Sequence, residues 1–167
     1  MIKIVFAVGE DNSFGFQNRL PWPHNKQDML NFARETKDSV VVMGANTFIS
    51  LPHLLPGRTH AVISSRIGFD RVLTQNGCRP DIIAFGDIDN LLAELSDAYE
   101  TVCVIGGPKV IADCLHLADE IVLTSIAGSY EHDVSFDADV LAKIRSFRLV
   151  GQDWYDGLLV NRYKVTK

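Results

Sequence analysis

Five short runs of apolar residues constrain the fold of this chain more than any other feature of its sequence. Runs of this length that are apolar almost throughout are typical of strands buried on both faces, as in a parallel sheet. The runs cover residues 2–8, 39–43, 59–63, 101–105 and 120–126. Segments with helical spacing separate them, at residues 25–36, 45–51, 87–99 and 109–115. The alternation predicts an α/β fold, with a mostly parallel sheet flanked by helices.

The C-terminal part of the sequence departs from this alternation. Residues 147–154 and 158–165 bracket Tyr155-Asp156-Gly157, which is the pattern of a hairpin. We therefore expect a mixed sheet with a C-terminal antiparallel hairpin. Short strands are also expected at 71–74 and 81–85, around a turn at Gly77. No repeat, low-complexity run or linker interrupts the chain, so residues 1–167 are expected to form one domain.

Composition narrows the class of partner. The chain has 167 residues, of which 47% are hydrophobic and 22% charged, a globular composition that allows a sizeable core. Its net charge of −5 argues against nucleic acid or an anionic membrane as a partner. The three cysteines form no C-x-x-C pair and indicate a reducing compartment, so we expect a cytoplasmic protein. The five histidines lack metal-ligand spacing, so no metal site is expected.

The stretch from Leu20 to Phe32 changes from a rigid turn into a helix. Pro21 and Pro23 flank Trp22 and favour extended backbone before each proline. The helical period then predicts an apolar stripe of Asp28, Met29, Phe32, Ala33 and Thr36, and a solvent face of Lys26, Gln27, Asn31, Arg34 and Glu35. A carboxylate on an apolar face is costly without a partner. Asp28 is therefore either an acid favoured by the helix start or a carboxylate kept in a pocket to bind or protonate a ligand.

Glycine-containing and polar segments follow several predicted strands, where ligands bind in such sheets. They are residues 44–47, 64–66 and 106–109, together with the long loop 9–19, which could close over a site. These segments suit a dinucleotide lying across several strand ends, although neither G-x-G-x-x-G nor G-x-x-x-x-G-K-[ST] occurs. Arg58 suits a substrate carboxylate. Thr124, within an apolar strand, needs a partner that Asp28 could supply.

Six motifs follow one another along the chain. They are Leu20-Pro21-Trp22 before an acidic helix, Val42-Met43-Gly44-x-x-Thr47-Phe48, Leu55-Pro56-Gly57-Arg58, Ser64-Ser65, Val104-Ile105-Gly106-Gly107 and Leu123-Thr124. In this order and at this spacing the chain resembles the dihydrofolate reductase family over essentially its whole length. The resemblance implies NADPH-dependent reduction of 7,8-dihydrofolate to tetrahydrofolate, by hydride transfer to C6 and protonation at N5, in support of one-carbon metabolism and thymidylate synthesis. It also implies a cytoplasmic monomer without nucleic-acid or membrane partners.

The resemblance further implies roles for individual residues. Asp28 would bind N3 and the 2-amino group of the pterin with support from Thr124, Trp22 would position a water, and Leu20 completes the catalytic set. Arg58 would hold the glutamate α-carboxylate of the substrate. The expected substrate site also contains Val5, Met29, Phe32, Leu51 and Leu55. The expected NADPH site contains Ala7, Phe14, Gly15, Asn18, Gly44, Ala45, Asn46, Thr47, Ser64, Ser65, Arg66, Ile105, Gly106, Gly107, Lys109 and Val110.

Two features of the expected NADPH site follow from the same resemblance. Gly106 and Gly107 are expected to be joined by a cis peptide, and residues 15–20 to form a mobile loop that closes over the nicotinamide. Ala45 and Gly86 stand where many family members carry a basic residue, and Ile111 stands where the family has a tyrosine. A preference for NADPH over NADH would then rest on Ser65, Arg66 and Lys109.

Two other functions compete with this interpretation. The pyrimidine reductase of riboflavin synthesis shares the fold but acts on a ribosyl phosphate that has no pterin. A binding or structural protein could keep the fold and have lost turnover. The combination of Asp28, Trp22 and Thr124 argues against both alternatives.

Overall fold

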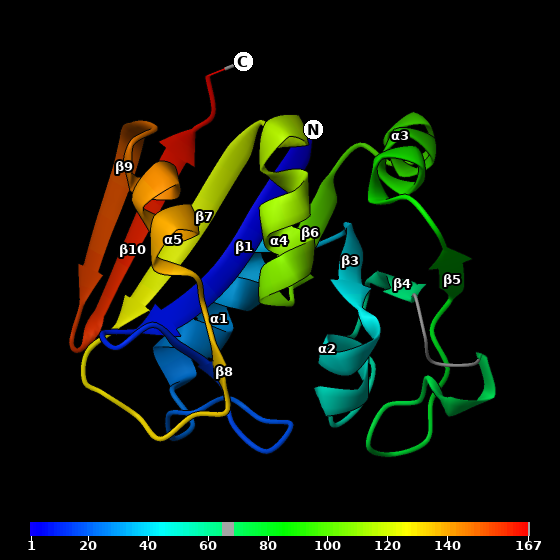
Figure 1. Cartoon of the computed structure of the whole chain (residues 1–167), viewed down its shortest axis with the longest axis horizontal. Helices are drawn as coiled ribbons and strands as arrows, with labels where there is room; N and C mark the ends of the chain where they lie inside the picture. Colours follow the sequence, from blue (N-terminus) through cyan, green and yellow to red (C-terminus); the bar gives the residue numbers. More distant parts are fainter. Residues whose placement is uncertain (65–68, 167) are drawn as a thin grey trace.

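The computed structural model describes residues 1–64 and 69–166, and a large mixed sheet organises them (Figure 1). Among these residues, eight strands pair in the order β5-β4-β3-β6-β1-β7-β10-β9. The strands are β1 (Ile2–Gly9), β3 (Val40–Gly44), β4 (Thr59–Ser64), β5 (Ile82–Phe85), β6 (Val102–Gly106), β7 (Glu120–Ile126), β9 (Arg148–Tyr155) and β10 (Leu158–Lys164). The pairs from β5 to β7 are parallel, whereas β10 is antiparallel to both β7 and β9. The predicted α/β fold with a mostly parallel sheet and a C-terminal hairpin is confirmed.

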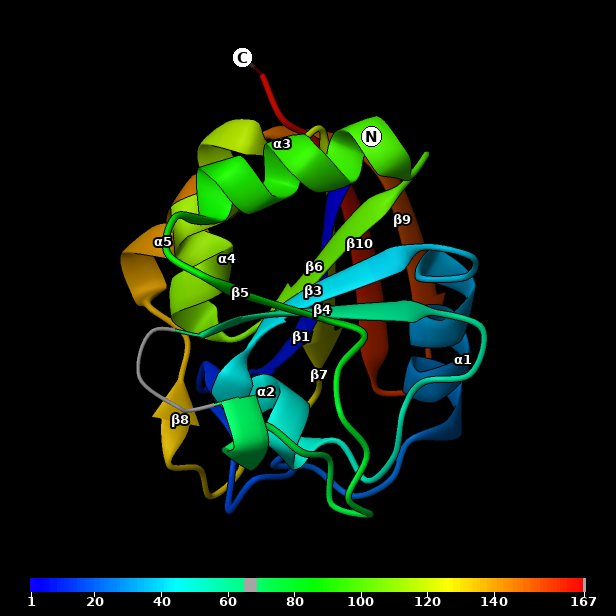
Figure 2. The ribbon, with the colours of Figure 1, turned by 90° about the vertical axis from the view of Figure 1, so that its right-hand side faces the viewer.

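Helices cover both faces of this sheet. They are α1 (Lys26–Glu35), α2 (Ala45–Ser50), α3 (Ile88–Ala98), α4 (Pro108–Cys114) and α5 (Ala138–Arg145), with short 3-10 turns at Phe69–Arg71 and Leu115–Leu117. Buried side chains of α3, α4 and α5 share one apolar core with the sheet. Phe48 of α2 belongs to a second core, and Phe32 of α1 packs against it. Figure 2 shows α1 on one side of the sheet and α4 and α5 on the other.

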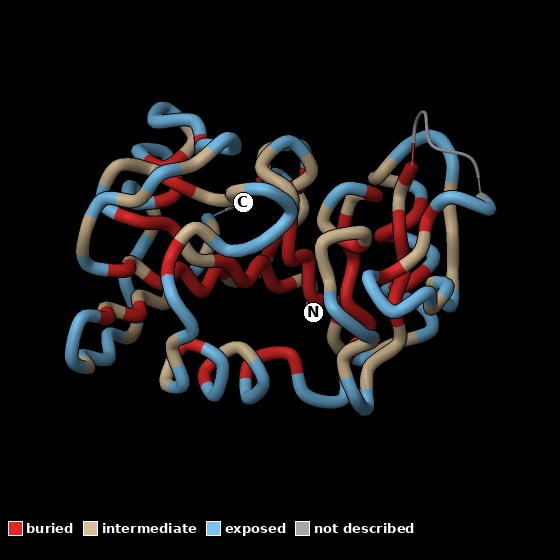
Figure 3. Tube along the Cα trace, turned by 90° about the horizontal axis from the view of Figure 1, so that it is seen from below, coloured by how far each residue is buried: buried red, intermediate tan, exposed pale blue. Residues whose placement is uncertain are grey.

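Buried residues follow the strands, and exposed residues follow the connections between them (Figure 3). The loop expected at residues 9–19 contains a short strand, β2 (Ser13–Gly15), which pairs with β8 (Val134–Ser135). This small second sheet joins the long N-terminal loop to the segment that follows β7. The loop is therefore held by backbone pairing to a distant part of the chain.

Two expectations about local structure were wrong, and one helix was missed. Residues 71–74 form no strand, because Thr74 closes a turn in which its N–H donates to Cys78 O at 2.9 Å and its hydroxyl accepts from Cys78 N–H at 2.9 Å. Helix α5 was not predicted, although Asp137 caps its first turn. The two faces of α1 also differ from the prediction, because Asn31 and Glu35 are buried while Met29 is exposed. Polar partners, described below, account for the burial of Glu35.

Candidate active site

The carboxyl ends of four central parallel strands meet at one edge of the sheet and bring several predicted site residues together. Ala7 of β1 lies beside Thr124 of β7, and Val5 lies beside Val122. On the other side, Gly106 at the end of β6 lies beside Met43 of β3. This is the edge at which parallel α/β sheets bind ligands.

Asp28 lies in the first turn of α1 and is buried, with 8% of its surface exposed. The side-chain oxygen of Asn25 caps the helix by accepting from Asp28 N–H at 3.0 Å. Burial raises the pKa of the Asp28 carboxyl, and the neighbouring indole of Trp22 opposes this rise. A carboxylate withdrawn from water in this way has to find its partners in a ligand or in the protein.

Trp22 forms the wall beside this carboxylate. It is buried with Ile126 and Leu158, and its ring meets Tyr130 edge-on at a centroid distance of 5.9 Å. Its indole Nε1 is buried and has no well-aligned hydrogen-bond acceptor in the described ranges. The indole N–H is thus a polar group available to a ligand or a water beside Asp28.

Thr124 is buried in β7 but does not make the direct contact expected with Asp28. Among the described residues, no hydrogen bond joins these two side chains, and the carboxyl of Asp28 has the indole of Trp22 as its polar neighbour. The Thr124 hydroxyl and the Asp28 carboxyl are therefore not bonded to each other, and each could contact a ligand independently.

The expected apolar wall is partly assembled. Val5 is buried in the second core, and Phe32, Leu51 and Leu55 pack against that core. These residues come from β1, α1 and the segment after α2, so three parts of the chain form one apolar surface. Met29 and Leu20 lie outside this surface, with exposed fractions of 42% and 51%.

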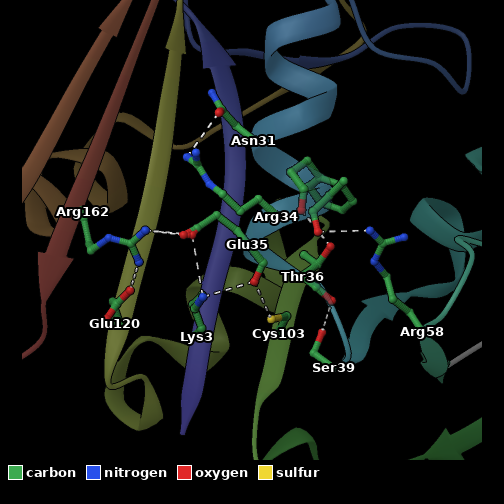
Figure 4. A network of polar contacts seen from close by, with 12 residues as sticks. Lys3, Asn31, Arg34, Glu35, Thr36, Ser39, Arg58, Cys103, Glu120 and Arg162 are labelled. Atoms are coloured by element: carbon green, nitrogen blue, oxygen red, sulfur yellow. Dashed lines mark hydrogen bonds and ion pairs between the residues drawn. The ribbon is translucent and has the colours of Figure 1, made fainter.

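Arg58 is held at the C-terminal end of α1 (Figure 4). Its Nη2 donates to Ala33 O at 3.2 Å, and its Nη1 donates to Pro56 O at 3.1 Å. Its Nε is buried and has no hydrogen-bond partner in the part of the chain that the structure describes. The guanidinium is thus oriented by backbone carbonyls and keeps donors for an anion.

An ion network holds the last turn of α1 against the sheet (Figure 4). Arg162 of β10 donates to both carboxylate oxygens of Glu35 and to Glu120 of β7. Lys3 Nζ lies 3.8 Å from Glu35 Oε2 and donates to the Glu35 carbonyl at 3.1 Å. These residues were absent from the predicted site, and they fix the end of the helix whose start carries Asp28.

Glycines shape the edge expected to hold the nicotinamide cofactor. Gly106 and Gly107 are joined by a cis peptide, as expected. Gly106 has a φ of 151°, and a Cβ there would lie 3.2 Å from Phe14 Cζ and 3.3 Å from Thr47 Oγ1. Three residues predicted to bind NADPH, from separate parts of the chain, therefore meet at this point, and only glycine allows so close an approach.

The residues around these glycines fit a nucleotide cofactor. Gly44 and Gly107 precede α2 and α4, and no side chain caps either helix among the described residues. The free N–H groups of their first turns, which in α4 begin at Lys109 because Pro108 has none, are donors of the kind that phosphates need. Val110 packs close to Gly44, and Ile105 is buried in β6.

For the other predicted cofactor residues within the described ranges, the structure gives burial and pairing. Ala45 is buried in the second core, whereas Asn46 beside it is exposed. Lys109 is exposed and pairs with Asp113 at 2.9 Å. Ser64 is buried at the end of β4, and Ser65 and Arg66 lie outside the described residues.

The loop expected to be mobile makes two backbone contacts with the segment after β7. Gln17 N–H donates to Asp133 Oδ2 at 3.0 Å, and Asp133 N–H donates to Gly15 O at 3.0 Å. Asn18, in the same loop, is exposed and has a φ of 58°. Sequence reasoning did not find Asp133, because no local pattern links it to residues more than a hundred positions earlier.

The described residues lack two features that mark other classes of protein. No group of three or more His, Cys, Asp or Glu residues there could hold a metal ion. No described helix has the length and apolar character that a membrane crossing requires.

The model of the family described as dihydrofolate reductase matches residues 1–156. The chain belongs to the dihydrofolate reductase family. Dihydrofolate reductase type 9 of Escherichia coli is 30% identical over 154 residues, which is 90% of this chain and 82% of that protein. The dihydrofolate reductase of Ureaplasma parvum is 28% identical over 169 residues, covering 100% of this chain and 99% of its own. The solved dihydrofolate reductase of Enterococcus faecalis, complexed with NADP(H) and RAB-propyl, has a TM-score of 0.82 at 23% identity, covering 100% and 97% of the chains.

Family membership confirms the predicted class of protein. Dihydrofolate reductases are oxidoreductases that reduce dihydrofolate, which is the class of activity predicted from the sequence. The solved structure of the dihydrofolate reductase from Enterococcus faecalis supports the fold. The roles of individual residues are a separate question, and they rest on the geometry described above.

Proposed function

We propose that this dihydrofolate reductase acts through Asp28, with hydride transfer from NADPH to C6 of 7,8-dihydrofolate and protonation of N5. The observation that carries the proposal is a buried carboxylate beside a buried indole N–H that has no well-aligned acceptor among the described residues. A pterin has a guanidine-like edge, which a carboxylate can bind through two charge-assisted hydrogen bonds. Asp28 would bind and polarise the pterin, and Thr124 would support the amino group.

Trp22 would hold the water through which the proton reaches N5. Its indole N–H lies beside the Asp28 carboxyl without a well-aligned acceptor in the described part of the chain, so these two groups together would orient a water between them. The raised pKa of Asp28 makes a proton available closer to neutral pH than an ordinary aspartate would. Leu20 would close this part of the site, together with the loop over residues 15–20, and exclude bulk water.

Arg58 would bind the glutamate α-carboxylate of the substrate. The protein carries a net charge of −5, so an anionic substrate needs a placed cation. Two backbone carbonyls already orient the Arg58 guanidinium. The apolar wall of Val5, Phe32, Leu51 and Leu55 would contact the pterin and benzoyl rings.

NADPH, when bound, supplies the hydride. The backbone of Ala7, the loop residues Phe14, Gly15 and Asn18, and the two glycine-led helix starts would hold the cofactor. Lys109 already pairs with Asp113, so a preference for NADPH over NADH would depend chiefly on Ser65 and Arg66. We further propose that the chain folds as one domain and acts as a cytoplasmic monomer without nucleic-acid partners.

A steady-state assay tests this proposal. Purified protein should consume NADPH only when dihydrofolate is present, and faster than it consumes NADH at the same concentration. Consumption is followed by the loss of absorbance of the reduced nicotinamide. No turnover with NADPH and dihydrofolate across a broad pH range would contradict the proposal.

A further inference from the structure

The segment between α2 and β4 carries Leu55 and Arg58 but has no regular structure of its own. Residues 51–58 form neither helix nor strand. Its start is held by Gln75 N–H, which donates to Leu51 O at 2.8 Å, and by Asn76 N–H, which donates to Pro52 O at 3.1 Å. A segment of this kind keeps its shape only through such individual contacts.

His60 supplies the contact in the middle of this segment. Its ring is fully buried in β4, and its Nε2 accepts a hydrogen bond from Leu55 N–H at 2.9 Å. The ring also meets Phe48 edge-on at a centroid distance of 6.1 Å, so its orientation is set by packing. One rigid side chain therefore fixes the backbone of Leu55 against the sheet.

The hydrogen bond identifies the protonation state of His60. Because Nε2 accepts, the ring proton must lie on Nδ1 and the imidazole must be neutral. Asp81 favours this tautomer, since its Oδ2 lies 3.5 Å from His60 Nδ1. The same oxygen accepts from His60 N–H at 2.7 Å, which fixes the carboxylate beside the ring.

We propose that His60 is a positioning residue for the tail of the substrate. Its neutral imidazole holds Leu55, and through Leu55 the turn to Arg58, in the shape that receives the benzoylglutamate part of dihydrofolate. The inference rests on the proposed function, because it takes Leu55 and Arg58 as the tail-binding residues. His60 contacts no reacting atom, so it affects the binding of the tail and leaves hydride transfer unchanged.

Protonation would remove this support. A proton on Nε2 would place a donor against the Leu55 N–H, and the hydrogen bond would be lost. Burial lowers the pKa of His60. The charge of Asp81 beside the ring raises this pKa in part, and the charge of Arg58 lowers it further. The support is therefore complete above about pH 6.5, the ordinary value for histidine, and is lost as pH falls through the lowered pKa.

The test compares dihydrofolate with a dihydropterin that lacks the benzoylglutamate tail. His60→Leu should raise KM for dihydrofolate about three- to tenfold, which is the effect of one hydrogen bond. It should leave kcat and the KM for the tail-free substrate unchanged. His60→Gln, whose amide oxygen can take the place of Nε2, should restore KM. His116→Leu, at an exposed histidine that also pairs with an aspartate, is the matched control and should behave as the wild type.

A second measurement does not depend on the folding of His60→Leu. In the wild type, the ratio of KM for dihydrofolate to KM for the tail-free substrate should rise as pH falls below the ordinary range of histidine. In His60→Gln it should stay constant. Equal effects on the two substrates, or the same pH dependence in both proteins, would overturn the inference alone. Absence of turnover by the wild type would overturn the proposed function and this inference with it.

Discussion

Replacing Asp28 by asparagine should make the folded protein more stable while removing most of its activity. The side chain is buried, and burial raises the pKa of the carboxyl. A group with a raised pKa in the folded state favours folding at low pH, where it is protonated, and costs stability as pH rises through that pKa. At neutral pH the ionised Asp28 therefore destabilises the free enzyme, and asparagine removes this cost at nearly the same size.

Two local effects determine how much Asp28→Asn changes the free energy of unfolding. The first turn of α1 favours a negative charge by about 0.3–1 kcal/mol, which asparagine would forfeit. The hydrogen bond from Asp28 N–H to Asn25 belongs to the backbone and is kept. A single stabilising substitution of this kind adds about 0.5–2 kcal/mol, so at the middle of both ranges we expect a net gain of roughly 0.6 kcal/mol. For a chain of this size each kcal/mol raises Tm by about 2–4 °C.

Urea unfolding of the ligand-free proteins measures this gain at neutral and acid pH. The difference should disappear at acid pH, where Asp28 is protonated in both states, and turnover at neutral pH should fall about 10²–10⁴-fold. Asp139→Asn, at an exposed acid in the first turn of α5, is the control and should lose a few tenths of a kcal/mol with normal activity. A less stable Asp28→Asn protein, or one with near-normal turnover, would refute the reasoning.

Two further substitutions test the ends of the site. Arg162→Leu leaves Glu35, whose side chain is 7% exposed, with Lys3 at 3.8 Å as its remaining cation. The Arg162 side chain is 34% exposed and partly screened by water, so the free energy of unfolding should fall by about 2 kcal/mol, less than the 3–5 kcal/mol expected for a fully buried pair. Urea unfolding measures this loss. An equal loss in Arg148→Leu, at an exposed arginine, would contradict the prediction. Arg58→Leu should raise KM for dihydrofolate about 10- to 100-fold with little change in kcat, and an unchanged KM in steady-state kinetics would mean that another cation holds the tail.

Features that depend on neighbouring residues could be predicted from the sequence, whereas features that depend on distant partners could not. The central strands are apolar almost throughout, so a local pattern identified them. Motif spacing predicted site roles for Asp28, which the structure buries, and for Arg58, which two backbone carbonyls orient. The burial of Glu35 could not be read in this way, because its partner Arg162 lies 127 positions away. A hydrophobic pattern places a charged residue on the solvent face unless the partners are known.

His60 and α5 show signals that the sequence held but that pattern reading did not use. A histidine inside the apolar run 59–63 must be buried, and a buried ring nitrogen needs a partner. Asp137 followed by apolar residues at helical spacing is a helix start. The turn at Thr74 was harder to predict, because Val72 is buried like a strand residue although it lies in a loop.

The bond from Arg58 to Ala33 O links α1 to the segment after α2, two of the parts of the chain that form the apolar wall. The same helix is tied to β10 by Arg162 and to β1 by Lys3. A substitution in that distant network should shift α1 and Arg58 together. If Arg58 binds the substrate tail as proposed, substrate affinity would then change although every residue proposed to contact the ligand stays the same.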